Sequence, residues 1–104
     1  MVHELKIRSE YFEAVCKGKK TFEVRKNDRP FHVGDLLGLN EIDFRNGTRY
    51  TGRAIVVRVT YILNDYPDLL REGAVILGIK VVELTDAHGN RATVGCEKWE
   101  EVKA

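Results

Sequence analysis

The chain has 104 residues and a formal net charge of +1 at pH 7, with 43% hydrophobic and 32% charged residues. These values predict one folded domain over residues 1–104 and exclude an intrinsically disordered chain. The longest apolar runs, Ala54–Val57 and Ala74–Leu77, are far shorter than the roughly 18 residues of a membrane span. The first residues are charged where an export signal would be apolar, so we expect a cytoplasmic protein without a membrane partner.

A short strand and a short helix are the first elements predicted along the chain. Leu5 and Ile7 alternate with charged neighbours, which is the two-residue period of a strand. Ser9 is a good N-cap residue, and Gly18 suits the left-handed position that ends a helix. We therefore predict an amphipathic helix over residues 10–17. Its expected buried face consists of Tyr11, Phe12, Val15 and Cys16.

The next strand is predicted over residues 21–25, where polar and apolar side chains alternate. We expect Phe22 and Val24 to point inward. Thr21, Glu23 and Arg25 then share the opposite face of the strand. The sequence Asn-Asp-Arg-Pro at positions 27–30 is typical of a turn.

The rest of the chain continues the β pattern. Further strands are predicted over residues 36–42, 53–63 and 74–82, with turns at 33–35 and 86–90 and a weak pairing near Thr93. We expect Trp99 to close one end of the core. Cys16 and Cys96 are isolated and are interpreted as packing residues rather than zinc ligands or a disulfide. Many strands with one short helix predict an α+β, mainly β, domain: a small β-barrel with the helix packed at its mouth.

Basic residues gather between positions 17 and 32: Lys17, Lys19, Lys20, Arg25, Lys26 and Arg29. Such a cluster attracts phosphate groups, although a solvated charged hairpin has the same composition. Glu23 and Arg25 are near neighbours on one face of the predicted strand. The carboxylate can orient the guanidinium toward a phosphate or a base edge, or the two can form an ordinary surface ion pair.

The segment Gly18–Arg25 resembles the GxKxxExR motif of the ASCH domain, a branch of the PUA-like β-barrels. The likeness to a small bacterial and phage family within this group covers nearly the whole chain. It is carried by four further segments, at residues 3–7, 11–15, 26–29 and 31–37.

This resemblance implies a PUA-like barrel that holds RNA or a nucleotide-like small molecule in a cleft between the helix and the sheet. The Lys, Glu and Arg of the motif, which line that cleft in ASCH domains, correspond to Lys20, Glu23 and Arg25. Gly18 makes the turn before them. We expect three flanking cations to take part in ligand binding as well: Lys19, Lys26 and Arg29.

Two other functions stay open. Some ASCH-like proteins are hydrolases, and one removes the acetyl group from N4-acetylcytidine; its motif Lys and Arg correspond to Lys20 and Arg25. Glu23 stands where that enzyme has its nucleophilic Thr, which argues against the same chemistry. Lys20 and Glu23 remain candidate catalytic residues, since a carboxylate can act as a general base on water. The third possibility is a module that binds a protein partner.

The histidines His3, His32 and His88 lie far apart and lack the spacing of metal ligands. We therefore expect neither a metal nor another cofactor, and interpret His3 and His32 as structural residues.

Phe31 lies in the basic loop. It can stack on a base or anchor the loop in the core, and the anchor is the favoured interpretation.

Overall fold

The computed structural model describes residues 1–45, 47–65, 68, 70–86 and 91–93. The elements in chain order are β1 (Val2–Arg8), α1 (Ser9–Cys16), β2 (Phe22–Lys26), β3 (Leu36–Asp43), β4 (Arg49–Leu63), β5 (Ala74–Thr85) and β6 (Arg91–Thr93). The described part of the chain is therefore mainly β with one N-terminal helix, which confirms the predicted fold class.

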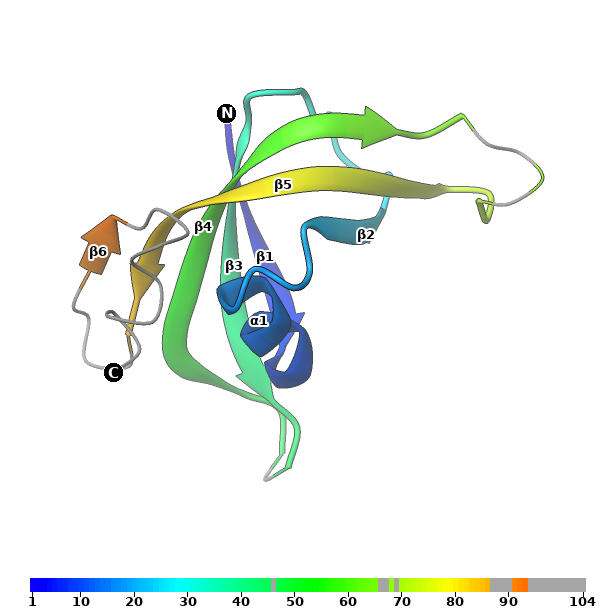
Figure 1. The fold of residues 1–104 in the computed structure, drawn as a ribbon. Coiled ribbons are helices and arrows are strands. Elements are labelled where there is room, and N and C mark those ends of the chain that lie inside the picture. Colours follow the sequence, from blue (N-terminus) through cyan, green and yellow to red (C-terminus); the bar gives the residue numbers. More distant parts are fainter. Residues whose placement is uncertain (46, 66–67, 69, 87–90, 94–104) are drawn as a thin grey trace.

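The strands form one sheet in the order β1-β3-β4-β5-β2, with β6 paired to β5. β1 runs parallel to β3, and the other pairs are antiparallel. Figure 1 shows that the sheet curls and that α1 lies at its open side. The long strands β4 and β5 extend together beyond the curled part, and β2 lies beside β5. β1 and β2 are the two end strands of the path, and α1 connects them in the chain.

The hydrophobic core fills the concave side of the sheet, and α1 covers it with three buried side chains, Phe12, Val15 and Cys16. Burial of one large apolar side chain contributes roughly 1.5–3 kcal/mol, so this face holds the short helix in place. The inward residues of the sheet come from every second position of β1, β4 and β5. They include Leu5, Ile7, Ile55, Val57, Val59, Val75, Leu77 and Ile79.

Two details of α1 differ from the sequence prediction. Ser9 is the first helical residue rather than the N-cap; Arg8 takes the cap position, without a side-chain cap hydrogen bond. The Ser9 hydroxyl donates instead to the carbonyl oxygen of Ile42 in β3, at 3.2 Å. This hydrogen bond takes the place of the predicted cap hydrogen bond. Tyr11 is exposed rather than buried. The end of the helix is as predicted, since Gly18 has a φ of 73°.

The two long strands extend past their predicted limits. β4 begins at Arg49 because Ile42 pairs with Tyr50 and Asp43 with Arg49 beyond an irregularity in β3. β5 continues to Thr85, and β6 pairs with its last residues, Thr93 with Glu83 and Arg91 with Thr85. The sequence pattern does not mark these ends. The limits of β4 and β5 depend on which residues of the neighbouring strands pair with them. The predicted turn at 86–90 lies largely outside the described residues, and Cys96 and Trp99 lie wholly outside them.

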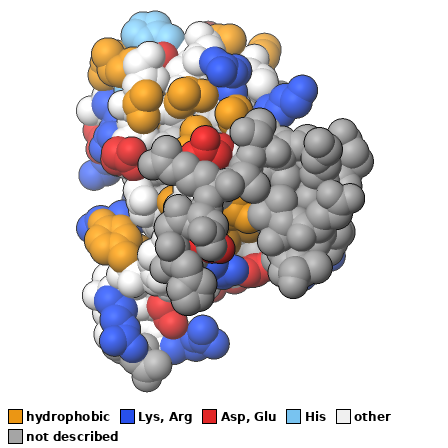
Figure 2. Space-filling view, turned by 90° about the vertical axis from the view of Figure 1, so that its left-hand side faces the viewer, with side chains coloured by type: hydrophobic (Ala, Val, Ile, Leu, Met, Phe, Trp, Pro, Cys, Tyr) orange, Lys and Arg blue, Asp and Glu red, His pale blue; other side chains and the backbone are white. Residues whose placement is uncertain are grey.

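Charged side chains of both signs mix on the surface. Figure 2 shows one face, on whose described part Lys and Arg side chains are interspersed with Asp and Glu, and several hydrophobic side chains lie together near the top. Attraction for a polyanion therefore has to come from local groups of cations rather than from the net charge of +1. Among the described residues, no helix has the length and apolar character needed to cross a membrane.

Candidate functional site

A cavity of about 480 Å³ lies between the two end strands of the sheet, and we call it the seam cavity. Its walls are three residues of β1, Tyr11 of α1, Lys20 and four residues of β2. The two strands do not pair with each other in the described sheet, so the cavity occupies the place where a closed barrel would have continuous hydrogen bonding. Its volume falls in the range of small-ligand sites.

A buried carboxylate lies in the wall of this cavity. Glu23 is only 3% exposed and accepts hydrogen bonds on both oxygens, from Lys20 Nζ on Oε1 and from Arg25 Nε on Oε2, the latter at 2.9 Å. Lys20 Nζ also donates to the carbonyl oxygen of Phe22 at 2.8 Å. Burial of a carboxylate is costly unless cations and hydrogen bonds compensate it, and here both do. The three side chains are therefore fixed in one arrangement.

Arg25 also reaches across the seam. Its Nη2 donates to the carbonyl oxygen of Lys6 on β1, at 2.6 Å. A side chain of one end strand thus satisfies a backbone acceptor of the other end strand. The guanidinium of Arg25 is oriented by Glu23 on one side and by β1 on the other.

Aromatic rings border the seam cavity. Tyr11 is 46% exposed and Phe22 is 45% exposed, and both line it. Lys20 Nζ lies 5.4 Å from the ring centroid of Tyr11 and 5.1 Å from that of Phe22. These are cation–π distances. The cavity therefore offers flat apolar faces together with fixed donors and acceptors, a combination that suits a planar polar ring.

The predicted direction of two β2 side chains is wrong. Phe22 and Val24 are exposed, while Glu23 lies on the inner face, opposite the buried Leu77 of β5. The alternation of polar and apolar residues divides the side chains of β2 into two sets on opposite faces, but it does not show which set points inward. The apolar set, here Phe22 and Val24, is normally assigned to the core. Here the ion pairs of Glu23 stabilise the inward carboxylate. Thr21, Glu23 and Arg25 nevertheless lie in the predicted relation to one another along the strand.

The structure brings together three of the six predicted site residues, Lys20, Glu23 and Arg25, around the seam cavity. The other three lie outside its lining. Lys19 is exposed just after the helix, where its N–H donates to the Ala14 carbonyl oxygen at 2.9 Å. Lys26 ends β2 and is exposed, and Arg29 Nε lies 3.6 Å from a carboxylate oxygen of Asp28.

Phe31 and two histidines have structural positions. Phe31 packs against the core, with its ring centroid 4.9 Å from that of His3, which favours the anchor interpretation. His3 Nε2 lies 2.8 Å from Asp35 Oδ2, and the backbone N–H of His32 donates to the same oxygen at 2.9 Å. The hydrogen bond with His3, supported by that of His32, lowers the pKa of Asp35 to about 2.

In the part of the chain that the structure describes, no three His, Cys, Asp or Glu residues are grouped as metal ligands.

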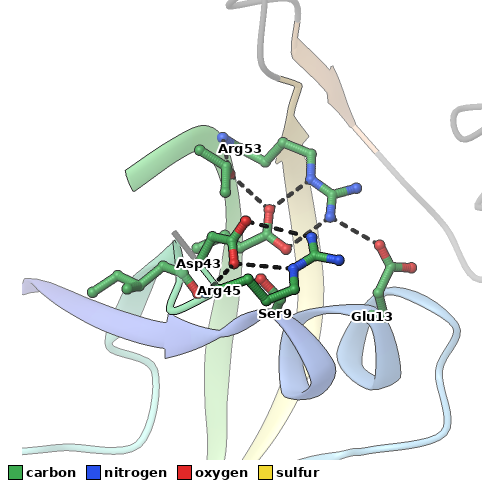
Figure 3. A network of polar contacts seen from close by, with 8 residues as sticks. Ser9, Glu13, Asp43, Arg45 and Arg53 are labelled. Atoms are coloured by element: carbon green, nitrogen blue, oxygen red, sulfur yellow. Dashed lines mark hydrogen bonds and ion pairs between the residues drawn. The ribbon is translucent and has the colours of Figure 1, made fainter. Parts of the chain in front are cut away.

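A second cavity, of about 670 Å³, lies at the N-terminal end of α1 and contains a network that the sequence did not reveal. At its centre, Glu41 accepts hydrogen bonds from Arg53 Nε at 2.7 Å and from Thr51 Oγ1 at 2.7 Å. Figure 3 shows the Arg53 and Glu13 side chains of this network turned toward each other. Arg53 Nη2 also donates to Glu13 of α1, at 2.9 Å. Burial raises the pKa of Glu41, but the hydrogen bonds from Arg53 and Thr51 outweigh it and leave that pKa lowered. The pKa of Arg53 is raised, chiefly by Glu41.

Each arginine around this second cavity has a carboxylate partner. Arg53 pairs with Glu13 and Glu41, Arg45 Nε lies 3.2 Å from Asp43, and Arg8 Nη2 lies 2.8 Å from Glu10. The positive charges are thus compensated within the protein. Because the Arg53 contacts join α1 to β3 and β4, this network holds the helix on the sheet.

Comparison with known families places the chain. A family model described as a domain of unknown function, DUF3850, matches residues 2–79. The chain belongs to the DUF3850 family. The matched region includes every residue that lines the seam cavity and the second cavity.

A phage protein is a relative in sequence. The "Uncharacterized 12.9 kDa protein in GpA 3'region" of Escherichia phage P2 is 39% identical over 71 residues, 68% of this chain. The match covers 62% of the phage protein, so this chain spans less than two thirds of that relative's length.

Two crystal structures share the fold. A variant of ZmASCH from Zymomonas mobilis has a TM-score of 0.55 and 12% identity, over 98% of this chain and 94% of that one. The hypothetical protein PH0355 has a TM-score of 0.51 and 18% identity, over 79% of this chain and 100% of that one. The fold is therefore ASCH-like: the described residues form the curled, half-closed sheet of a small PUA-like barrel with one helix, as the sequence predicted.

Proposed function

We propose that this domain binds RNA or a nucleotide-like molecule, with a base held in the seam cavity. One observation carries the proposal: the buried Glu23, fixed between Lys20 and Arg25, lies in a cavity bordered by the exposed rings of Tyr11 and Phe22. Recognition of single-stranded RNA combines aromatic stacking with hydrogen bonds to base edges. The seam cavity offers both.

Each polar side chain has a distinct part in this proposal. Glu23 Oε1 accepts a hydrogen bond from an exocyclic amino group of the base. It can do so in addition to the hydrogen bond from Lys20, since the two oxygens of a carboxylate together have about four acceptor positions. Arg25 uses Nε and Nη2 within the protein, so Nη1 is the donor available for a base edge or a phosphate. Lys20 neutralises Glu23 and faces both rings. The flanking cations Lys19, Lys26 and Arg29 add positive potential for a phosphate outside the cavity.

The fold agrees with this function, because PUA-like domains commonly bind RNA. The net charge of +1 favours a short or single-nucleotide ligand over a long polyanion, whose affinity depends on many phosphate contacts. The competing explanation is purely structural: Glu23 and Arg25 only tie β2 to β1. That explanation accounts for the Arg25 contact with Lys6, but it leaves the two exposed rings without a role.

A hydrolase acting on a modified nucleoside is the second candidate. The observation in its favour is the Lys20–Glu23 pair in the cavity wall, which can hold a water next to a carboxylate that accepts its proton. Thr21 lies outside the cavity lining, and no other threonine among the described residues lines it. The binding experiment below distinguishes the two functions when its samples are also analysed for products.

The experiment is a thermal-shift screen against nucleosides, modified nucleosides, nucleotides and short RNAs, with the Arg25→Ala and Glu23→Gln variants alongside. A ligand that binds only the folded state raises the midpoint as its concentration exceeds its dissociation constant. We expect one class of compounds to raise the midpoint by several degrees in the native protein and in Arg49→Ala, an exposed arginine on β4, but not in the two cavity variants. Product formation would identify the hydrolase.

Absence of a shift with every compound would contradict the proposal and favour a protein partner. A shift that Arg25→Ala and Glu23→Gln both retain would place the ligand elsewhere. The unliganded midpoints of the variants show whether each one folds.

A further inference from the structure

The outer face of β2, β5 and β4 carries a second pair of aromatic side chains next to the seam cavity. Phe22 of β2 and Tyr61 of β4 both pair with Gly78 of β5, from opposite sides. Cross-strand partners project to the same face of a sheet. Since Leu77 and Ile79 of β5 point into the core, Phe22 and Tyr61 both project outward. Figure 1 shows the three strands side by side where β4 and β5 leave the curled part of the sheet.

Gly78 adds no side chain of its own between the two rings, and the Thr60 hydroxyl lies over it. Two strand spacings separate β2 from β4, roughly 10 Å. A flat base between two rings needs about two van der Waals contact distances, ~7 Å. A Cβ atom at Gly78 would lie 3.0 Å from Thr60 Oγ1 and 3.3 Å from the Tyr61 Cβ, because β4 is irregular between Val59 and Tyr61. The irregularity thus requires glycine here and places the Thr60 hydroxyl over Gly78, at the base of the gap between the two rings.

The chemistry around this gap favours a polyanion with apolar faces. Tyr61 is 66% exposed, and Val24 is exposed in the adjacent row. Lys80 and Arg58 pair in the next row on this face, and Lys26 lies two rows away on the other side, opposite Ala74. The acidic Glu83, opposite Val56, lies beyond the pair of Lys80 and Arg58. Bases stack on aromatic rings, whereas phosphates pair with the flanking cations.

We propose that the ligand is a single-stranded RNA of several nucleotides, whose chain leaves the seam cavity over Phe22 and places a following base between Phe22 and Tyr61. Phe22 connects the two places, because it borders the cavity and also forms one side of the gap. This inference rests on the proposed function and adds to it: the gap gives an oligonucleotide an advantage over a mononucleotide.

The test compares two probes by fluorescence anisotropy and competition: a mixed-sequence single-stranded RNA of about eight nucleotides and the four nucleoside monophosphates. Tyr61→Ala is expected to weaken RNA binding about tenfold, the usual size of one lost stacking contact, and to leave monophosphate binding unchanged. Tyr61→Phe keeps the ring and should restore RNA affinity. Tyr50→Ala, which removes a similarly exposed tyrosine at the other end of β4, is the matched control and should have no effect.

Three results would overturn the inference. If monophosphates bind and depend on Arg25, but Tyr61→Ala binds RNA as well as the native protein does, the gap has no role while the proposed function stands. If neither probe binds, both proposals fail together. If Tyr61→Ala changes sedimentation of the protein without RNA, the face is an interface between copies of the chain.

Discussion

The two most informative carboxylates of this domain, Glu41 and Glu23, look alike at first. Both are almost completely buried, at 2% and 3% exposure, and both are paired with an arginine. Each also lies beside a cavity at the open side of the sheet. The two carboxylates differ in how far along the sequence their partners lie.

The partners of Glu41 are distant in sequence. Arg53 is 12 residues away, and it also reaches Glu13, 40 residues from itself. These contacts exist only when α1, β3 and β4 are assembled. Arg53 lies over the Phe12 ring as well, at 4.7 Å, so it belongs to the packing of the helix.

The partners of Glu23 are local. Lys20 is three residues away and Arg25 is two residues away, so most of this cluster is set by the conformation of one strand. Exposed aromatic rings border the same cavity. We infer that the long-range network stabilises the fold, whereas the local cluster presents a fixed set of polar groups to a ligand.

The largest effect is expected from Arg53→Met. This change leaves the buried carboxylate of Glu41 without its cation, and such a loss costs about 3 kcal/mol in unfolding free energy. Methionine keeps much of the stem that packs near Phe12. Urea denaturation followed by circular dichroism measures the difference.

Arg25→Met is the matched control for that measurement. Since Lys20 still pairs with the buried carboxylate of Glu23 after this change, the loss should stay at or below about 1.5 kcal/mol. Equal losses in the two variants would show that the two clusters do not differ in the way described above.

A smaller effect is expected from acid, through Asp35. Like Glu41, Asp35 is bound to a distant partner, His3, 32 residues away. Its pKa is lowered to about 2 in the folded protein, below its value of about 3.9 in unfolded chains. The folded state therefore binds the proton less readily, and the contribution of Asp35 to stability is present above pH ~4 and is lost as the pH falls toward 2.

Urea unfolding at several pH values between 7 and 2 measures this contribution. The Asp35→Asn variant should show a shallower loss of stability between pH ~4 and 2 than the native protein. Identical slopes in the two proteins would mean that other carboxylates account for the acid sensitivity.

The fold was largely predictable, because apolar alternation and turn residues mark the strands whatever their partners. The resemblance of Gly18–Arg25 to the ASCH motif named Lys20, Glu23 and Arg25, which the structure then places around one cavity. The direction of β2 was not predictable from alternation. The pattern cannot show that Lys20 and Arg25 pair with Glu23 on the inner face while Phe22 lies on the exposed face.

The Glu41 network was missed because its pairing depends on the register of β3 and β4. One signal was present: Glu41 follows Leu37 and Leu39 at the two-residue period of a strand, so it falls on the inward face and needs a buried partner. The gap between Phe22 and Tyr61 was missed for a similar reason. Only the register with Gly78 shows that these residues flank the same position.

The most direct test of the central claim is a two-dimensional NMR titration of the ¹⁵N-labelled protein with the four nucleoside monophosphates. The Nε–H signals of the arginine side chains report on the two clusters in one experiment. We predict that a binding nucleotide shifts the Nε–H signal of Arg25 and the amide signals of residues 20–25, while the Nε–H signal of Arg53 stays in place. Shifts centred on Arg53 and Glu41 instead, or no shift with any nucleotide, would contradict the assignment of ligand binding to the seam cavity.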